Sequence, residues 1–208
     1  MRSEMGANEG LRSEGLRGAR RERLLDIAAG LVLEEGLDAV RPGRIAERVG
    51  CTRPLVYQYF RSREEILLRL AEDFYREFDP HWDAIVERIF EPGWIPGERG
   101  DLSEAGSEAQ VGARSLAGLA VRVRAVRSAS PGGGLEELKS TYERRWSRTL
   151  EVQGVEATRA ALVLESLFAG ALEVGMRVRD RTVESRGAWA ELLWLFRSLL
   201  ASAPRQHS

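Results

Sequence analysis

Apolar residues in this chain recur every three or four positions in one segment after another, which places them along one side of an α-helix. Leu24, Ile27, Ala28 and Leu31 show this spacing first, and Gly36 follows where a helix would end. No stretch alternates apolar and polar residues over a useful strand length, and no long internal repeat occurs. The sequence therefore predicts an all-α protein of about nine helices.

Capping and helix-breaking residues set the expected boundaries. Ser62 and Glu65 stand at the spacing of a capping box, so a helix is expected to begin near Arg63. Asp79 followed by Pro80 has the pattern of an N-cap and a first helical residue, which predicts a separate helix there. The expected helices span residues 20–35, 42–49, 53–60, 63–78, 80–90, 103–128, 135–152, 155–179 and 184–201.

Composition narrows the classes of function. Of the 208 residues, 43% are apolar and 30% are charged, which is typical of a soluble globular chain. No stretch comes near the roughly 18 uncharged apolar residues of a membrane span, and the N-terminus lacks the apolar core of a signal peptide. We therefore expect a cytoplasmic protein that does not bind a membrane.

Few side chains are available for common catalytic chemistry. Cys51 is the single cysteine, and His81 and His207 are the two histidines. They cannot form a disulfide or a Cys/His zinc cluster within one chain, and neither histidine has the context of a catalytic triad. We therefore expect no enzymatic activity, no metal and no cofactor.

The net charge of −1 hides an uneven distribution. Residues 1–63 carry twelve arginines against nine acidic residues, whereas residues 64–208 carry nineteen basic against twenty-three acidic residues. The positive excess is concentrated in residues 41–63, with six arginines and one glutamate. A small basic region on an acidic body indicates a nucleic-acid partner.

The basic region contains two short expected helices, 42–49 and 53–60, joined by a three-residue turn. Together with the expected helix 20–35 they form a helix-turn-helix domain. Such a helix fits the major groove of B-DNA, where side chains near its N-terminus reach base edges and the helix end favours phosphate. The residues spaced to hold the two short helices together are Ile45, Val49, Val56 and Phe60.

The predicted helices and the charge distribution divide the chain into three parts. Residues 1–18 have no sustained apolar period and are expected to form a flexible N-terminal arm. Residues 19–63 are the expected helix-turn-helix domain, with double-stranded DNA as its partner. Residues 64–203 are the expected larger helical domain for ligand binding and dimerisation.

Residues 45–67 read IAERVGCTRPLVYQYFRSREEIL. This segment resembles the tetracycline-repressor (TetR) family, whose pattern is approximately Ile-Ala-Glu-x-x-Gly-Val-Ser-x-x-x-Leu-Tyr-x-Tyr/His-Phe-x-x-Lys-Glu-x-Leu. The resemblance extends from Arg20 to Leu67, and its most specific parts are Tyr-x-Tyr-Phe and Glu-Glu-Ile. It implies a homodimeric transcriptional regulator, most often a repressor, that binds a palindromic operator and is released by a small-molecule effector.

The resemblance also implies roles for single residues. Thr52, Tyr57 and Tyr59 would contact phosphates, and Arg63 would replace the phosphate-binding lysine at the start of the following helix. An arginine at the base-facing surface suits the O6 and N7 atoms of guanine. The residues that would face bases are Arg53, Pro54, Leu55 and Gln58.

Two positions depart from the family pattern. Members usually begin the first of the two short helices with Ser or Thr, an apolar residue and often an arginine, whereas this chain has Arg41-Pro42-Gly43-Arg44. Gly43 cannot make the contact of that arginine, so Arg41 or Arg44 would supply it. Cys51 replaces a typical valine and fills its space as a small hydrophobe.

The last two expected helices are more apolar than one chain can bury. Residues 184–201 are apolar nearly all round, and a terminal helix cannot bury every side against one neighbour. A homodimer resolves the excess through a bundle of two helices from each chain, which the resemblance also implies. The expected interface residues are Leu164, Phe168, Leu172, Leu193, Phe196 and Leu200.

The resemblance further implies a pocket for a small-molecule effector between the DNA-binding domain and this bundle. For each aromatic residue here, plain core is the alternative. If Arg122, Arg124 or Arg127 points inward, an anionic ligand such as an acyl-CoA or a carboxylate fits; otherwise the pocket is apolar. The residues expected to line it are Phe74, Phe78, Trp82, Trp94, Arg122 and Trp146.

Two other functions remain open from the sequence. One is a helical small-molecule-binding protein or enzyme with a vestigial DNA-binding domain, although the scarcity of nucleophile, histidine and metal ligands opposes catalysis. The other is a DNA-binding organiser that senses nothing, which predicts a filled body with no pocket.

Overall fold

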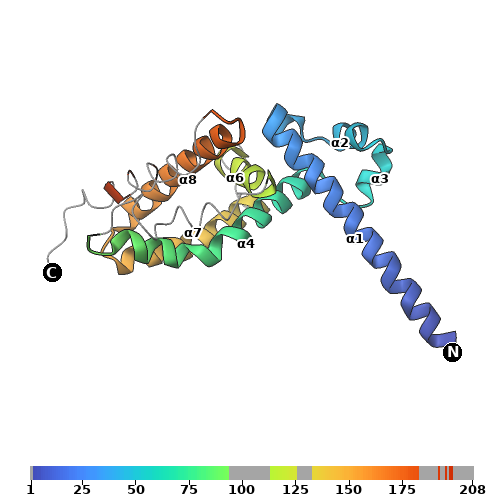
Figure 1. Ribbon diagram of the computed structural model, residues 1–208, viewed down its shortest axis with the longest axis horizontal. Helices are drawn as coiled ribbons and strands as arrows, with labels where there is room; N and C mark the ends of the chain where they lie inside the picture. The colour runs from blue at the N-terminus through green and yellow to red at the C-terminus, as the bar shows by residue number, and fades with distance from the viewer. Residues whose placement is uncertain are drawn as a thin grey trace.

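The computed structural model describes residues 2–93, 113–125 and 133–182, with positions 192, 195, 197 and 198, and side chains from residue 15 onward. Every regular element in these ranges is a helix, which confirms the all-α class. A long first helix and two short ones form one end of the molecule, and four longer helices form the other (Figure 1). Within the described ranges, no helix combines the length and apolarity needed to span a membrane.

Helix α1 (Arg2–Glu35) is longer than the sequence predicts. The backbone of residues 2–18, expected to be a flexible arm, is helical and extends away from the rest of the molecule (Figure 1). Apolar periodicity reports burial and not helix formation, so it is silent on a helical segment that projects into solvent. The other end agrees with expectation: α1 ends before Gly36, whose φ is +89°.

The helix-turn-helix consists of α2 (Pro42–Val49) and α3 (Arg53–Tyr57). Gly50 ends α2 in the left-handed conformation with φ 75°, as its sequence position predicts. A short 3-10 turn, η1 (Leu37–Ala39), connects α1 to α2. Helix α3 is shorter than the expected range 53–60, because residues after Tyr57 turn toward the next helix.

Helix α4 (Arg63–Phe90) begins at the predicted cap, where the Ser62 hydroxyl accepts a hydrogen bond of 3.2 Å from the Glu65 amide. The predicted break at Asp79 and Pro80 is wrong, because α4 continues through Pro80 as one helix. The Asp79 carboxylate does not cap a helix; it accepts a hydrogen bond of 2.8 Å from the Trp146 indole N–H. Packing of α4 against the helix that carries Trp146 thus outweighs the helix-start pattern of Asp79 and Pro80.

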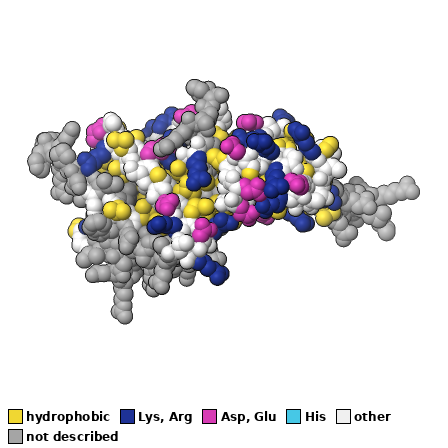
Figure 2. All heavy atoms as spheres, turned by 90° about the horizontal axis from the view of Figure 1, so that it is seen from above, with side chains coloured by type: hydrophobic (Ala, Val, Ile, Leu, Met, Phe, Trp, Pro, Cys, Tyr) yellow, Lys and Arg dark blue, Asp and Glu magenta, His cyan; other side chains and the backbone are white. Residues whose placement is uncertain are grey.

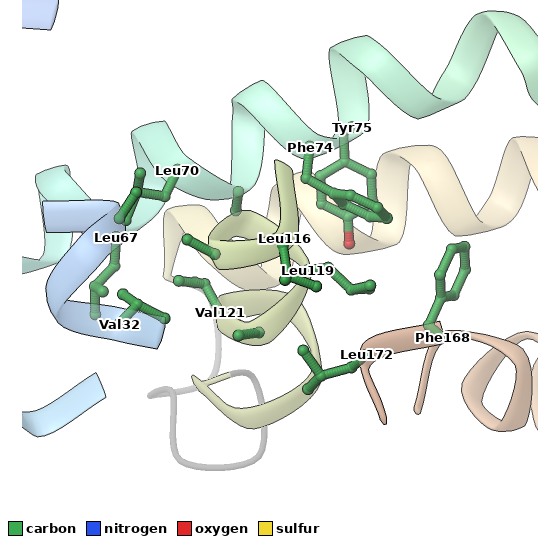
Figure 3. Close-up of a cluster of buried hydrophobic side chains, with 14 of the residues drawn as sticks. Val32, Leu67, Leu70, Phe74, Tyr75, Leu116, Leu119, Val121, Phe168 and Leu172 are labelled. Carbon is green, nitrogen blue, oxygen red and sulfur yellow. The ribbon is translucent and has the colours of Figure 1, made fainter. Parts of the chain in front are cut away.

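The body consists of α4, α6 (Ala113–Ala125), α7 (Gly134–Val152) and α8 (Ala157–Arg179). Helix α6 lies between α1, α4 and α8, and one apolar core runs through all of them (Figure 3). Positions 192, 195, 197 and 198 are helical, within the expected helix 184–201. Leu192 packs against α8 where Gly170 leaves room for it.

Candidate nucleic-acid interface

Helix α3 divides into a buried side and an exposed side. Val56 and Phe60 are buried in the core between the short helices, as predicted from their spacing. Leu55 and Tyr59 are half-buried at the edge of this core. The exposed side, which is free to meet a DNA groove, carries Thr52, Arg53, Pro54, Tyr57 and Gln58.

Arg53 and Tyr57 hold each other in position on this exposed side. One Arg53 Nη donates a hydrogen bond of 3.0 Å to the Tyr57 hydroxyl. The guanidinium carbon also lies 5.4 Å from the centroid of the Tyr57 ring. The pair is one turn of helix apart, so one phosphate contact and one base contact can be presented together.

The start of α3 leaves polar groups available. Thr52 is the N-cap residue of α3, but its side chain makes no capping hydrogen bond. Of the backbone groups that follow, Pro54 has no N–H, and the Leu55 N–H donates to the Thr52 carbonyl at 3.0 Å. The exposed threonine hydroxyl is therefore the group suited to a phosphate, which is the role that the family resemblance implies for it.

The arginines of α2 already have carboxylate partners. Arg44 pairs with Glu35 at 3.2 Å and with Glu47 at 2.7 Å, and Arg48 pairs with Glu35 at 2.7 Å and with Glu34 at 2.8 Å. The hydrogen bond from Arg44 lowers the pKa of the Glu35 carboxyl, and Arg48 adds to this effect. Part of the positive charge of α2 is therefore neutralised by the end of α1. Since exposed ion pairs contribute little, a phosphate can compete for Arg44.

Arg63, predicted to bind phosphate, has a structural role in this conformation. Its Nε donates a hydrogen bond of 3.0 Å to the Val40 carbonyl, and its Nη2 donates one of 2.9 Å to the Leu37 carbonyl. Asp38 lies 3.6 Å from the same group. The planar fork of an arginine bridges the two carbonyls through two separate nitrogens, Nε and Nη2.

The surface charge is mixed on the face shown in Figure 2, where basic and acidic side chains lie next to each other. Arg114 of α6 illustrates this mixing: it contacts Glu22 at 2.6 Å and Asp26 at 2.9 Å, both on α1. It also lies 3.8 Å from Asp73 of α4. These contacts tie the body to the helix that supports the helix-turn-helix.

The aromatic residues predicted to line a pocket pack against each other. Trp82 and Trp146 are fully buried and their ring centroids lie 5.6 Å apart, and Phe74 and Phe78 are stacked at 5.6 Å. Trp94 lies outside the described residues. Among the described side chains, one aromatic cluster joins α4, α7 and α8, and its members are Phe74, Tyr75, Phe78, Trp82, Tyr142, Trp146 and Phe168.

Arg122 points into this region, whereas Arg124 on the same helix is exposed. The Arg122 guanidinium carbon lies 4.2 Å from the centroid of the Phe168 ring. It pairs with Glu143 of α7 and, at 3.3 Å, with Glu165 of α8. The sequence left the direction of Arg122 open; the structure places it inward, with carboxylates beside it.

Three residues predicted for the dimer interface face the interior of a single chain. Leu164 and Phe168 are 1% exposed and Leu172 is 5% exposed, so their side chains are already covered by the same chain. Leu193, Phe196 and Leu200 lie outside the described side chains. Periodicity identifies the apolar side of α8 but not what covers it. The outward side of α8 instead carries Ala161, Leu162, Ser166 and Ala169.

Sequence reasoning missed the acidic partners of Arg122 and the nearby hydroxyl of Tyr75. Lys139 and Glu143 are four residues apart on α7, a pattern that in sequence indicates an ordinary exposed ion pair. Glu165 stands within an apolar helix, and that interruption is the one signal of its position. Nothing in the sequence indicates that these residues converge.

Comparison with known proteins agrees with this geometry. Residues 24–70 match the profile of the family described as bacterial regulatory proteins, tetR family. This range spans the second half of α1, the helix-turn-helix and the start of α4. Among curated proteins, no sequence matches the chain significantly.

Three solved structures can be aligned with most of the chain. A tetR-family transcriptional regulator from Streptomyces coelicolor is 22% identical, with 88% of this chain and 81% of that chain covered and a TM-score of 0.44. A protein described as a transcriptional regulator from Saccharomonospora viridis, in complex with choline, is 18% identical, with coverages of 89% and 97% and a TM-score of 0.47. The fatty acid degradation regulator FadR from Bacillus halodurans is 15% identical, with coverages of 90% and 97% and a TM-score of 0.45.

Proposed function

We propose that the chain, whose residues 24–70 match the tetR family of bacterial regulatory proteins, is a ligand-responsive repressor that binds a palindromic operator as a homodimer. In this proposal residues 19–63 bind DNA, and residues 64–203 bind the effector and form the dimer. The observation that carries it is the exposed side of α3, on which Arg53, Tyr57 and Gln58 are free to meet a groove.

The connection between the two ends of the molecule supports the effector part of the proposal. Helix α4 starts directly after the helix-turn-helix and continues into the aromatic cluster. Helix α6 contacts α1 through Arg114 and carries Arg122 two turns further on. A ligand that shifts α4 or α6 would therefore move the helix-turn-helix and weaken operator binding, provided that it binds the two arrangements unequally.

The proposal is tested by selecting binding sites from random duplex DNA with the purified full-length protein. A DNA-binding dimer with two-fold symmetry should enrich a palindrome whose half-sites are about 34–36 Å apart, or a multiple of that spacing. Binding should weaken steeply as salt increases, because phosphate contacts release counterions. Enrichment of no palindrome would overturn the proposal.

Arg53→Ala and Tyr57→Phe should have different effects on the selected operator. Arg53→Ala should weaken operator binding by about 10- to 100-fold and relax the preference at one base pair, because an arginine–guanine contact discriminates by about 1–3 kcal/mol. Tyr57→Phe keeps the ring and removes the phosphate-binding hydroxyl together with its hydrogen bond to Arg53, so affinity should fall for all sequences, and the base preference should relax less than in Arg53→Ala. Binding assays with single-base operator variants check this.

The control for both variants is Arg124→Ala, which removes an exposed charge of the same kind from α6. It should leave operator affinity unchanged. If Arg53→Ala and Tyr57→Phe both weaken binding with the base preference unchanged, the base-reading role of Arg53 is wrong.

The dimer is proposed to form through the outward side of α8, where Leu162 is 65% exposed among small residues. Leu162→Glu should weaken dimerisation at least about tenfold, because it would bury an unpaired carboxylate between the chains. Sedimentation velocity over a concentration series measures this. Leu16→Glu is the matched control, since Leu16 is also 65% exposed but lies on α1. Equal dimer stability in the two variants would contradict the proposed interface.

A further inference from the structure

Charged side chains from three helices meet inside the body, next to the aromatic cluster. Arg122 of α6 is fully buried at its side chain, and Glu143 of α7 contacts its Nη2. Glu165 of α8 lies 3.3 Å from the Nη1 of Arg122 and 2.6 Å from the Nζ of Lys139. We call these four residues the charged cluster. The hydroxyl of Tyr75 on α4 is close enough to Arg122 for the guanidinium to affect its pKa.

Two donors at this cluster are poorly paired. Neither the Nε of Arg122 nor the hydroxyl of Tyr75 makes a hydrogen bond of good geometry, although the guanidinium lies close enough to that hydroxyl to oppose the rise of its pKa. Burial raises the pKa of Tyr75 well above its ordinary value, so its hydroxyl keeps its proton throughout the physiological range. Figure 3 shows this hydroxyl pointing from α4 into the helical body. Since an arginine Nε can only donate and the Tyr75 hydroxyl keeps its proton, a group that pairs with both must be an acceptor.

The two carboxylates of the cluster are held differently. The Glu143 side chain is 19% exposed, and burial raises the pKa of its carboxyl although Arg122 and Lys139 oppose this. The Glu165 side chain is 45% exposed, and its shorter contact is with Lys139. Of the two carboxylates, Glu165 is therefore the one that can release Arg122 and keep Lys139 as its partner.

The surroundings of the cluster are apolar. The Phe168 ring lies against the Arg122 guanidinium, and Trp146 lies 5.1 Å from Phe168 between ring centroids. Tyr75 itself stacks on Tyr142 at 4.7 Å. If a ligand places an acceptor group at these two donors, the rest of that ligand therefore lies in contact with aromatic side chains.

We propose that Arg122 and Tyr75 bind the carboxylate of the effector, a small carboxylic acid with an aliphatic or aromatic body. This inference rests on the proposed function, and it adds the chemical class of the effector. The carboxylate accepts hydrogen bonds from the Arg122 Nε and the Tyr75 hydroxyl, and the hydrocarbon part contacts the aromatic cluster. Glu165 gives way and remains paired with Lys139.

Octanoate and 4-phenylbutyrate, each compared with its primary alcohol, test the proposal on the full-length protein. Tryptophan fluorescence is a suitable readout because Trp82 and Trp146 lie in the aromatic cluster, and calorimetry provides an independent measure. At least one of the two acids should bind about tenfold or more tightly than its alcohol, because hydrogen bonds to a charged group are stronger than those to a neutral one.

Tyr75→Phe is the informative variant, because it removes one of the two donors and keeps the ring. The variant should fold as well as the wild type, since the lost hydroxyl makes no hydrogen bond of good geometry in the folded chain. It should bind the acid about tenfold more weakly and bind the alcohol unchanged. Tyr142→Phe, which changes the stacked neighbour in the same way, should bind the acid as the wild type does.

Three results would overturn the inference: no binding of either acid, no preference for acid over alcohol, or equal acid binding by Tyr75→Phe and the wild type. Operator binding is measured separately with the selected duplex. Acid binding that leaves operator affinity unchanged supports the carboxylate site and contradicts effector release in the proposed function. An absent palindrome contradicts the proposed function without affecting the acid titrations.

Discussion

Gly118→Ala should lower the free energy of unfolding by about 3 kcal/mol, at the upper end of the usual range for overpacking. A Cβ at this position of α6 would lie 2.1 Å from the Leu70 carbonyl oxygen and 2.7 Å from the Phe74 Cβ, both on α4. The obstacle is helix backbone, which cannot rotate away as a side chain can. The variant must therefore move α6 off α4, which opens the core between them. Urea unfolding followed by circular dichroism measures the loss.

Two other glycines provide graded controls for this prediction. Gly175→Ala would meet only the end of the Leu116 side chain, at 2.6 Å, so a rotamer change can relieve the contact and the loss should be smaller. Gly43→Ala has no atom within 4 Å and lies inside α2, so it should be neutral or up to about 1 kcal/mol more stable. Equal stability of all three variants would rule out the close approach of α6 to α4.

Arg122→Leu should destabilise the protein by about 3–5 kcal/mol, because it removes one partner of a buried ion pair and leaves the other charged. Glu143 would lose the guanidinium that opposes the rise of its pKa. For a carboxyl whose pKa is raised by folding, stability is present at low pH and is lost as pH rises through the folded pKa. The deficit of Arg122→Leu should therefore be larger at pH 8 than at pH 5.

A double variant separates lost pairing from lost packing. Arg122→Leu with Glu143→Leu replaces both charges by apolar groups and should recover most of the loss, since no buried charge is left without its partner. Arg124→Leu changes an exposed residue of the same helix and should stay within about 0.5 kcal/mol of the wild type. If the double variant is no more stable than Arg122→Leu, Glu143 is not the buried charge that the single substitution leaves without a partner.

Predictions from local sequence signals were accurate where the interacting residues lie a few positions apart in the chain. Ser62 caps α4, and Gly36 and Gly50 end their helices with positive φ, because each of these features depends on residues a few positions away. The buried side of α3 follows from the spacing of Val56 and Phe60 for the same reason.

Predictions that depended on distant partners were less complete. Asp79 looks like an N-cap in sequence, but Trp146 on another helix binds its carboxylate. The spacing of Phe168 and Leu172 indicates a buried side of α8, and in the structure α4 and α6 of the same chain cover it. Periodicity states that a side of a helix is buried, and it cannot state which surface buries it.

The continuity of α4 through Pro80 has a mechanical consequence. Its 28 residues make a rod about 42 Å long, at a rise of about 1.5 Å per residue. A rotation of only about 5° near one end displaces the other end by about 4 Å, which is close to the spacing of successive base pairs, about 3.4 Å. In the proposed repressor, a helix without a loop at Asp79 would carry a change of side-chain packing in the body to the DNA-binding end as a shift of about one base-pair step. Two shorter helices with a joint at Asp79 would absorb the same rotation at the joint.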